Sequence, residues 1–189
     1  GADATLFDIN ATTGVVTFKS APNYEAPADA GGNNVYDITV GASDGTNTTT
    51  KAVAITVTNV NEAPTITSGA AASFAENASG TVYTVAATDQ DAGATLTYSL
   101  TGTDAARFNI NSSTGAITFK SSPNYEAPTD AGANNVYDVT VRASDGTNIT
   151  SKAVAITVTN VNEAPTITSA ATASFAENGT GTVYTAAAT

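Results

Sequence analysis

The hexapeptide Asn-Val-Asn-Glu-Ala-Pro occurs twice in the chain, at 59–64 and again at 160–165. The two copies lie 101 residues apart, and the sequence around them returns at the same spacing. Residues 1–88 and 102–189 differ at only 20 aligned positions. The chain is therefore an array of one repeated unit, and this repeat constrains the fold more than any other feature.

A period of 101 residues is close to the usual size of one domain and much longer than a solenoid or propeller-blade repeat. We therefore expect each unit to have its own core. Residues 1–62 are the C-terminal part of a preceding unit, 63–163 a complete unit, and 164–189 the N-terminal strands of a following unit. Without an initiator Met, signal peptide or transmembrane run, the sequence is expected to be a piece of a longer protein.

The composition is acidic, with 17 Asp and Glu against 6 Lys and Arg and a net charge of −11. Nucleic-acid binding depends on clustered Lys and Arg, so this balance argues against it. The charge fits a surface that collects divalent cations, and it also fits a merely soluble extracellular protein. The absence of Cys and His excludes disulfides, thiolate metal sites and the commonest general base.

Short alternating segments rich in β-branched residues predict strands, and helical patterns are nearly absent. Only residues 104–107 predict a helical turn. About seven short strands per unit of roughly 100 residues predict an all-β fold of tandem β-sandwiches with antiparallel Greek-key connections. In the complete unit we expect strands at 65–68, 72–76, 81–87, 95–100, 107–111, 116–120, 135–143 and 150–159.

Alternation along these segments predicts the core. In the strand at 81–87, the face that carries Tyr83 and Val85 is expected to point inward. The aromatic residues are expected to be structural, because a sandwich without disulfides needs large side chains between its sheets. The predicted core is Phe74, Tyr83, Leu96, Tyr98, Phe108, Ile110, Ile117, Phe119, Tyr137, Val139, Val141, Val154, Ile156 and Val158.

Five polar motifs follow one another in the complete unit. They are Ala75-Glu76-Asn77, Asp89-Gln90-Asp91, Asn124-Tyr125-Glu126, Ala143-Ser144-Asp145, and the hexapeptide at 160–165. Each motif alone is weak, but the five in this order resemble the calcium-ligand set of cadherin-type repeats, specifically the cadherin-like repeats of giant bacterial surface adhesins. The resemblance covers the whole chain. It implies a non-enzymatic, extracellular cell-adhesion module that shares Ca²⁺ between one unit, the linker and the next unit.

The residue chemistry agrees with that resemblance, since Ca²⁺ takes six to eight oxygen ligands from carboxylates, amides, backbone carbonyls and water. The first junction is the more complete, because its partners from the next unit are present. Glu177 would supply the missing carboxylate there if it came from a neighbouring chain. The candidate ligands are Asn23, Glu25, Asn59, Asn61, Glu62, Asp89, Asp91 and Asp145 at the first junction, Glu76, Asn124, Glu126, Asn160, Asn162 and Glu163 at the second, and Glu177.

The sequence departs from the family pattern at the ligands. Asn replaces a family Asp at four positions, Glu replaces the linker Asp, and Ala replaces the linker Asn. These changes predict fewer ions or weaker binding, with dissociation constants on the order of 10⁻⁴–10⁻³ M. Alternatively, the acids and amides only form turns and solvated loops. The other acids, including Asp3, Asp29, Asp104 and Asp130, are expected in turns or on exposed strand faces.

Three functions remain open. The first is a structural spacer that calcium stiffens, with neighbouring repeats as partners and no membrane insertion. The second is a self-assembling filament, in which the tail 164–189 of one chain completes the head 1–62 of a neighbour by strand addition. The third is carbohydrate binding, for which Tyr24 and Tyr125 are the obvious candidates in a chain without Trp. Catalysis is disfavoured, because Asp89 and Asp91 in a Gly-containing loop are more typical of cation ligands than of a glycosidase pair.

Overall fold

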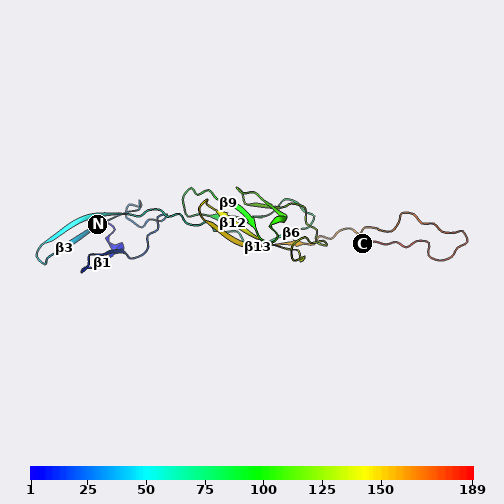
Figure 1. Ribbon diagram of the computed structural model, residues 1–189, viewed down its shortest axis with the longest axis horizontal. Coiled ribbons are helices and arrows are strands. Elements are labelled where there is room, and N and C mark those ends of the chain that lie inside the picture. The colour runs from blue at the N-terminus through cyan, green and yellow to red at the C-terminus, as the bar shows by residue number, and fades with distance from the viewer.

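A computed structural model describes all residues, 1–189, as an extended molecule (Figure 1). A head, a central sandwich and a tail follow one another along its long axis, and no helix is long and apolar enough to cross a membrane. The elements are η1 (Ala4–Leu6), β1 (Phe7–Ile9), β2 (Val16–Phe18), β3 (Val35–Ser43), β4 (Thr48–Thr56), β5 (Thr65–Ile66), β6 (Ala71–Ala75), β7 (Thr81–Thr84), β8 (Ala87–Thr88), β9 (Thr97–Thr101), η2 (Ala105–Arg107), β10 (Phe108–Ile110), β11 (Ala116–Phe119), β12 (Val136–Ser144) and β13 (Ile149–Thr159).

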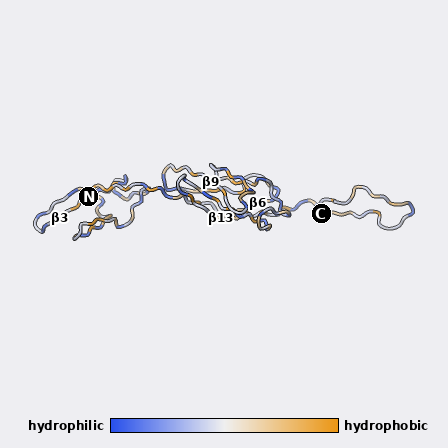
Figure 2. The backbone as a smooth tube through the Cα atoms, in the orientation of Figure 1, coloured by the Kyte–Doolittle hydropathy of each residue, from blue (hydrophilic) through white to orange (hydrophobic).

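The central unit is a β-sandwich, which confirms the predicted all-β fold. One sheet has the order β6-β13-β12-β9 and the other β10-β11-β7, while β5 pairs with β8 beside them. Polar and apolar residues alternate along these strands (Figure 2). Apart from 81–87, each predicted strand agrees with the structure to within two residues at each end, and the predicted helical turn is η2.

One strand pair departs from the predicted antiparallel pattern. β6 runs parallel to β13, with Ala71 opposite Ala155 and Ala75 opposite Thr159. β6 lies near the start of the unit and β13 at its end, so two strands pointing the same way require the chain to enter at one end and leave at the other. This pairing places successive units end to end.

The predicted strand 81–87 is interrupted. β7 pairs with β11, but the register shifts between Ile117 and Thr118, which oppose Tyr83 and Thr81. A bulge reverses the side-chain alternation, so Val82 and Val85 are both buried. The prediction that the Tyr83 face points inward was therefore wrong in part, since Tyr83 is only half-buried and its hydroxyl donates to the carbonyl of Gly69.

A glycine fixes the position of the chain after this bulge. Gly115 has a φ of +71°, in the left-handed region, and a Cβ at this position would clash with the carbonyl oxygen of Val85. The amide of Val85 donates to the carbonyl of Gly115 at 2.9 Å. Only a residue without Cβ allows this close approach between the hairpin after β10 and the end of β7.

The core of the central unit lies between its two sheets and contains most of the predicted residues. Phe108, Phe119 and Tyr137 pack together, with the Phe119 and Tyr137 rings 5.0 Å apart and nearly perpendicular. Leu96 does not belong to this cluster, because it precedes β9, and Leu100 packs against the core instead. The aromatic residues are therefore structural, as predicted.

Buried carboxylates organise the long loop between β11 and β12. They lie in turns and bends, as predicted, but their side chains are buried rather than solvated. Asp104 is 4% exposed, and its two oxygens accept the amides of Ala131 and Asp138 at 2.7 and 2.8 Å. Asp130 accepts the amides of Asn134 and Asn135. Asp3 and Asp29 make the equivalent bonds in the head. Hydrogen bonds from several N–H groups offset the cost of burying the charge.

The head contains the equivalents of η2 and β10–β13, with a small core of Phe7, Tyr36 and Ile38. The tail carries only an isolated bridge between Ile167 and Ala188. The boundaries at 62/63 and 163/164 stay predictions.

We expect Asp104→Asn to destabilise the central unit by about 1.5–3 kcal/mol, the usual effect of losing a hydrogen bond to a charged group. The NH₂ group of the asparagine would face one of the two backbone N–H groups that the carboxylate now accepts, so one hydrogen bond would be replaced by two opposed donors. Urea unfolding of the chain measures the loss, with Asp138→Asn as the control because its side chain is exposed. Equal midpoints for both variants would contradict the role given to Asp104.

Candidate metal centres at the unit junctions

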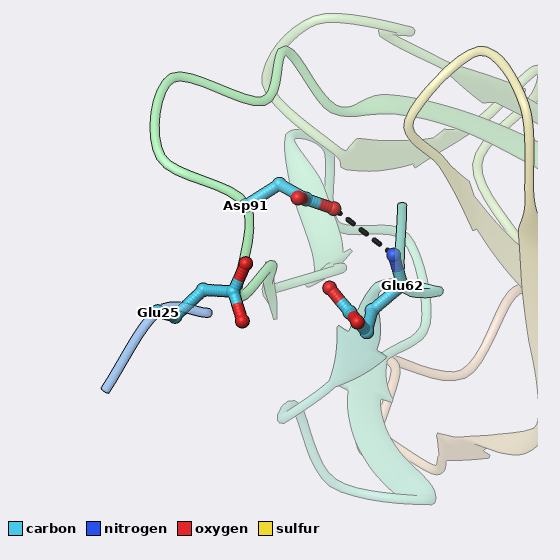
Figure 3. Close-up of side chains that lie close together, drawn as sticks. All are labelled: Glu25, Glu62 and Asp91. Atoms are coloured by element: carbon cyan, nitrogen blue, oxygen red, sulfur yellow. Dashed lines mark hydrogen bonds between the residues drawn. The ribbon is translucent and has the colours of Figure 1, made fainter. Parts of the chain in front are cut away.

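The first junction brings together residues from the head, the linker and the central unit. Glu25 comes from the loop between β2 and β3, Glu62 from the linker before β5, and Asp91 from the loop after β8 (Figure 3). One carboxylate oxygen from each lies within 4.8 Å of the others. Three acidic side chains from segments far apart in sequence thus face one another.

Backbone and amide N–H groups hold part of this arrangement. Asp91 accepts the Glu62 amide at 3.0 Å and the Asn59 side-chain amide at 2.8 Å. Asn61 donates to Asp145 at 2.8 Å, which ties the linker to the hairpin between β12 and β13. Asp89 accepts the Asp91 amide, and so orients the loop.

Three carboxylate oxygens at this junction are buried without a hydrogen-bond partner. They belong to Glu25 (Oε1), Glu62 (Oε2) and Asp89 (Oδ2). A buried unpartnered carboxylate oxygen is costly, so each one calls for a cation or an ordered water. Hard oxygen donors of this kind suit Ca²⁺, and no nitrogen or sulfur ligand is present, so the residues fit the ion.

The pKa values of two carboxylates at the first junction, Glu62 and Asp145, are shifted in opposite directions. Burial raises the pKa of Glu62, and the negative charges of Glu25 and Asp91 raise it further. In contrast, the N–H groups of Asn148 and the amide of Asn61 lower the pKa of Asp145. The carboxylate of Glu62 is therefore repelled by the charges of Glu25 and Asp91, and the hydrogen bonds of the junction do not compensate this repulsion.

The second junction is built around Glu76, which is 2% exposed at the end of β6. It accepts the amides of Tyr125 and Val161 at 2.7 and 2.8 Å, and these bonds lower its pKa. Carboxylate oxygens of Glu76, Glu126 and Glu163 lie within 4.8 Å of one another. One buried side chain thus fixes both the loop and the linker beside the cluster.

The remaining predicted ligands occupy supporting or separate places. Asn160 donates to Glu126 at 2.8 Å, and Asn162 bonds to the carbonyl of Glu163. Asn23 and Asn124 accept amides of their own loops. Glu177 is exposed in the tail and belongs to neither cluster.

Two residues at the junctions were missed from the sequence. Asn77 has a left-handed φ of 59° and donates to Glu163 at 2.8 Å, while Asn148 donates to the carbonyl of Asn61 across the first junction. Both lie within three residues of a predicted ligand, and Asn is enriched at left-handed positions. That local signal pointed to a turn rather than to a contact between units.

Comparison with known proteins agrees with this geometry. Residues 70–162 match the family model of the cadherin domain. This match spans most of the central unit, which is therefore similar to cadherin domains. Cadherin domains are extracellular adhesion modules without catalytic activity, which confirms that the chain is not an enzyme.

Similar proteins include ones from mouse and human. The chain is 37% identical over 147 residues to mouse protocadherin Fat 2, covering 75% of the chain and 3% of that protein. Mouse cadherin-23 EC22-24 has a TM-score of 0.54 and 26% identity, over 82% of the chain and 50% of that structure. Human protocadherin-24 EC1-2 has a TM-score of 0.58 and 23% identity over 85% of the chain and 80% of that structure, which shows the fold alone.

The opposite pKa shifts predict opposite pH effects. Glu62, with its pKa above 4.5, binds a proton more tightly in the folded junction, so its contribution to stability falls as pH rises through the interval above 4.5. Glu76, with its pKa below 4.5, contributes stability that is lost as pH falls through its lowered pKa. Carboxyl NMR titration in EDTA measures both.

Glu25→Gln should lower the pKa of Glu62, because it removes the neighbouring charge. Asp37→Asn, on the exposed face of β3, is the matched control and should leave it unchanged. A Glu62 pKa below 4.5 in the unaltered chain would contradict the assignment.

Proposed function

We propose that the chain is part of an extracellular surface array in which calcium stiffens the junctions between cadherin-like repeats. The observation that carries this proposal is the set of buried, unpartnered carboxylate oxygens of Glu25, Glu62 and Asp89 at the first junction. The array acts as a spacer that holds an adhesive part of the protein away from the cell. Its bacterial origin stays a prediction from the sequence.

The strand pairing aligns successive units along one axis. Because β6 and β13 are parallel, each unit receives the chain at one end and releases it at the other. Bending at the junction separates Glu25 of the head from Asp91 of the central unit. A cation held by both therefore resists bending, whereas the bare carboxylates repel one another.

The residues that would hold the ion at the first junction are Glu25, Glu62, Asp89 and Asp91, joined by amide oxygens of Asn59 and Asn61 after rotation of their side chains. Asp145 orients Asn61. At the second junction Glu76, Glu126 and Glu163 form the corresponding cluster. Bound calcium supplies charge neutralisation and a rigid link between units.

Calcium should stabilise the chain and lengthen the particle. Binding with a dissociation constant on the order of 10⁻⁴–10⁻³ M stabilises by about 2.7 kcal/mol at a free concentration of a hundred times that constant. Calorimetry and small-angle scattering against EDTA measure both effects. Glu62→Gln should weaken binding about tenfold by removing one ligand charge, whereas Asp37→Asn should not.

An unchanged melting temperature and an unchanged maximum dimension across the titration would overturn the spacer. Magnesium serves as a second control, because it requires a smaller and more regular ligand cage than these flexible carboxylates offer.

We also propose strand exchange between chains as a second candidate. The head has an apolar groove of about 200 Å³ beside Phe7, Ile38 and Val40. Their equivalents in the central unit pack against the strands β7 and β9. The tail exposes 58% of Val183 and 46% of Tyr184, which are equivalent to Val82 and Tyr83 of β7. A tail from a second chain can therefore supply the apolar side chains that this groove lacks.

Sedimentation of the 189-residue chain over a range of concentrations tests this exchange. We expect head-to-tail oligomers that Val183→Asp abolishes. Ile149→Asp is the matched control, because Ile149 is exposed in the complete unit and no strand covers it. A monomer at every concentration, in calcium and in EDTA, would exclude the exchange.

A further inference from the structure

A groove on the side of the central unit borders the second junction at Asn124, but none of the clustered carboxylates lines it. It has a volume of about 410 Å³ and lies between η2, the end of β11 and the loop that follows. This volume falls in the range of about 300–1,000 Å³ that is usual for small-molecule sites. Its chemistry differs from that of the rest of the chain.

The groove is cationic in an acidic protein. Arg107 and Lys120 line it, and none of the 17 acidic residues does. Lys120 donates to the carbonyl of Ala106 at 2.8 Å, which holds its ammonium group at the groove. An ammonium group has three donors, so two stay available to a ligand. The charge therefore favours an anion.

Hydroxyl groups line the same groove. Ser121 and Ser122 lie on one wall, and Thr129 contacts the hydroxyl of the buried Tyr137 at 3.1 Å. Phe119 adds an apolar surface. Cations, hydroxyls and an apolar face together suit a ring that carries hydroxyl groups and one negative charge.

The groove is held in shape by buried contacts. Asp104 and Asp130 bond to the loop that forms its far wall, and Glu76 accepts the Tyr125 amide. These bonds fix the backbone before any ligand arrives, which lowers the entropy lost on binding. Tyr125, a candidate from the sequence, does not line the groove.

The head contains a natural comparison. Its equivalent groove has a volume of about 370 Å³, and Lys19 donates to the carbonyl of Thr5 at 2.8 Å, as Lys120 does to Ala106. Leu6 stands there in place of Arg107, and Ala21 in place of Ser122. The two grooves are similar in volume, and the head groove has one positive charge fewer and Ala28 in place of Thr129.

We propose that the groove of the central unit binds an acidic sugar residue, a uronate of an extracellular polysaccharide, through Arg107 and Lys120. Arg107 forms a two-pronged contact with the carboxylate, Lys120 adds a second charge, and the serine and threonine hydroxyls bond to the ring hydroxyls. The head groove binds the same sugar more weakly, because it lacks the guanidinium. The array thereby gains its own contacts with a matrix, in addition to its role as a spacer.

Amide NMR of the 189-residue chain, titrated with digalacturonate in EDTA, tests the site. We expect shifts at residues 119–124 and η2 that saturate. Arg107→Leu should weaken binding about tenfold, and Leu6→Arg should strengthen binding at the head groove. Lys51→Leu removes an exposed positive charge elsewhere and should have no effect. Digalactose, a neutral ligand, should not bind.

Three results would overturn the proposal: no saturable shift, an equal effect of inorganic sulfate or of a sulfated sugar, or equal affinity in Arg107→Leu. Shifts that appear only with calcium would also overturn it, since the junction carboxylates would then hold the uronate through the ion. The spacer function is measured by calcium alone, without sugar, so the two proposals fail separately.

Discussion

The parallel pairing of β6 with β13 is the constraint on which the rest of the molecule depends. It sends the chain in at one end of the unit and out at the other, so each linker meets loops from two units. Carboxylates more than 60 residues apart, such as Glu25 and Asp91, become neighbours for this reason. An antiparallel pairing at the same place would fold the linker back along the sandwich and scatter the acidic groups.

The acids fall into two groups according to what satisfies their oxygens. Asp104, Asp130 and Glu76 are buried, and backbone N–H groups bond to both oxygens of each, so the charge is compensated within the protein. Glu25 and Glu62 each keep a buried oxygen without a partner. The first group positions loops, which Glu76 does at the edge of the second cluster, and the unpartnered oxygens of the second group are the ones that a cation stabilises most. Burial alone does not separate them; the hydrogen-bond partners do.

Much of this could be predicted from the sequence, because the repeat and the strand alternation are local signals. Strand positions and most of the core followed from them. The carboxylates of both clusters were named instead through the resemblance to cadherin-type repeats, and their role as ligands stays a prediction. The bulge in β7 could not, since the chain there is held by the close approach of Val85 to Gly115 in the turn between β10 and β11. The burial of Asp104 was missed for a similar reason, because its two donors, Ala131 and Asp138, lie 27 and 34 residues away.

The side-chain amides of the linker already connect the two units by hydrogen bonds without an ion. Asn59 and Asn61 donate to the same carboxylates, Asp91 and Asp145, that an aspartate at either position would repel. The units therefore hold together partly without an ion, and an ion that recruits the amide oxygens must first break these hydrogen bonds. Both effects reduce the net gain from calcium. Under the proposed calcium function, the construction of the linker predicts weak affinity, with stiffness that changes over the millimolar range of calcium rather than at trace concentrations.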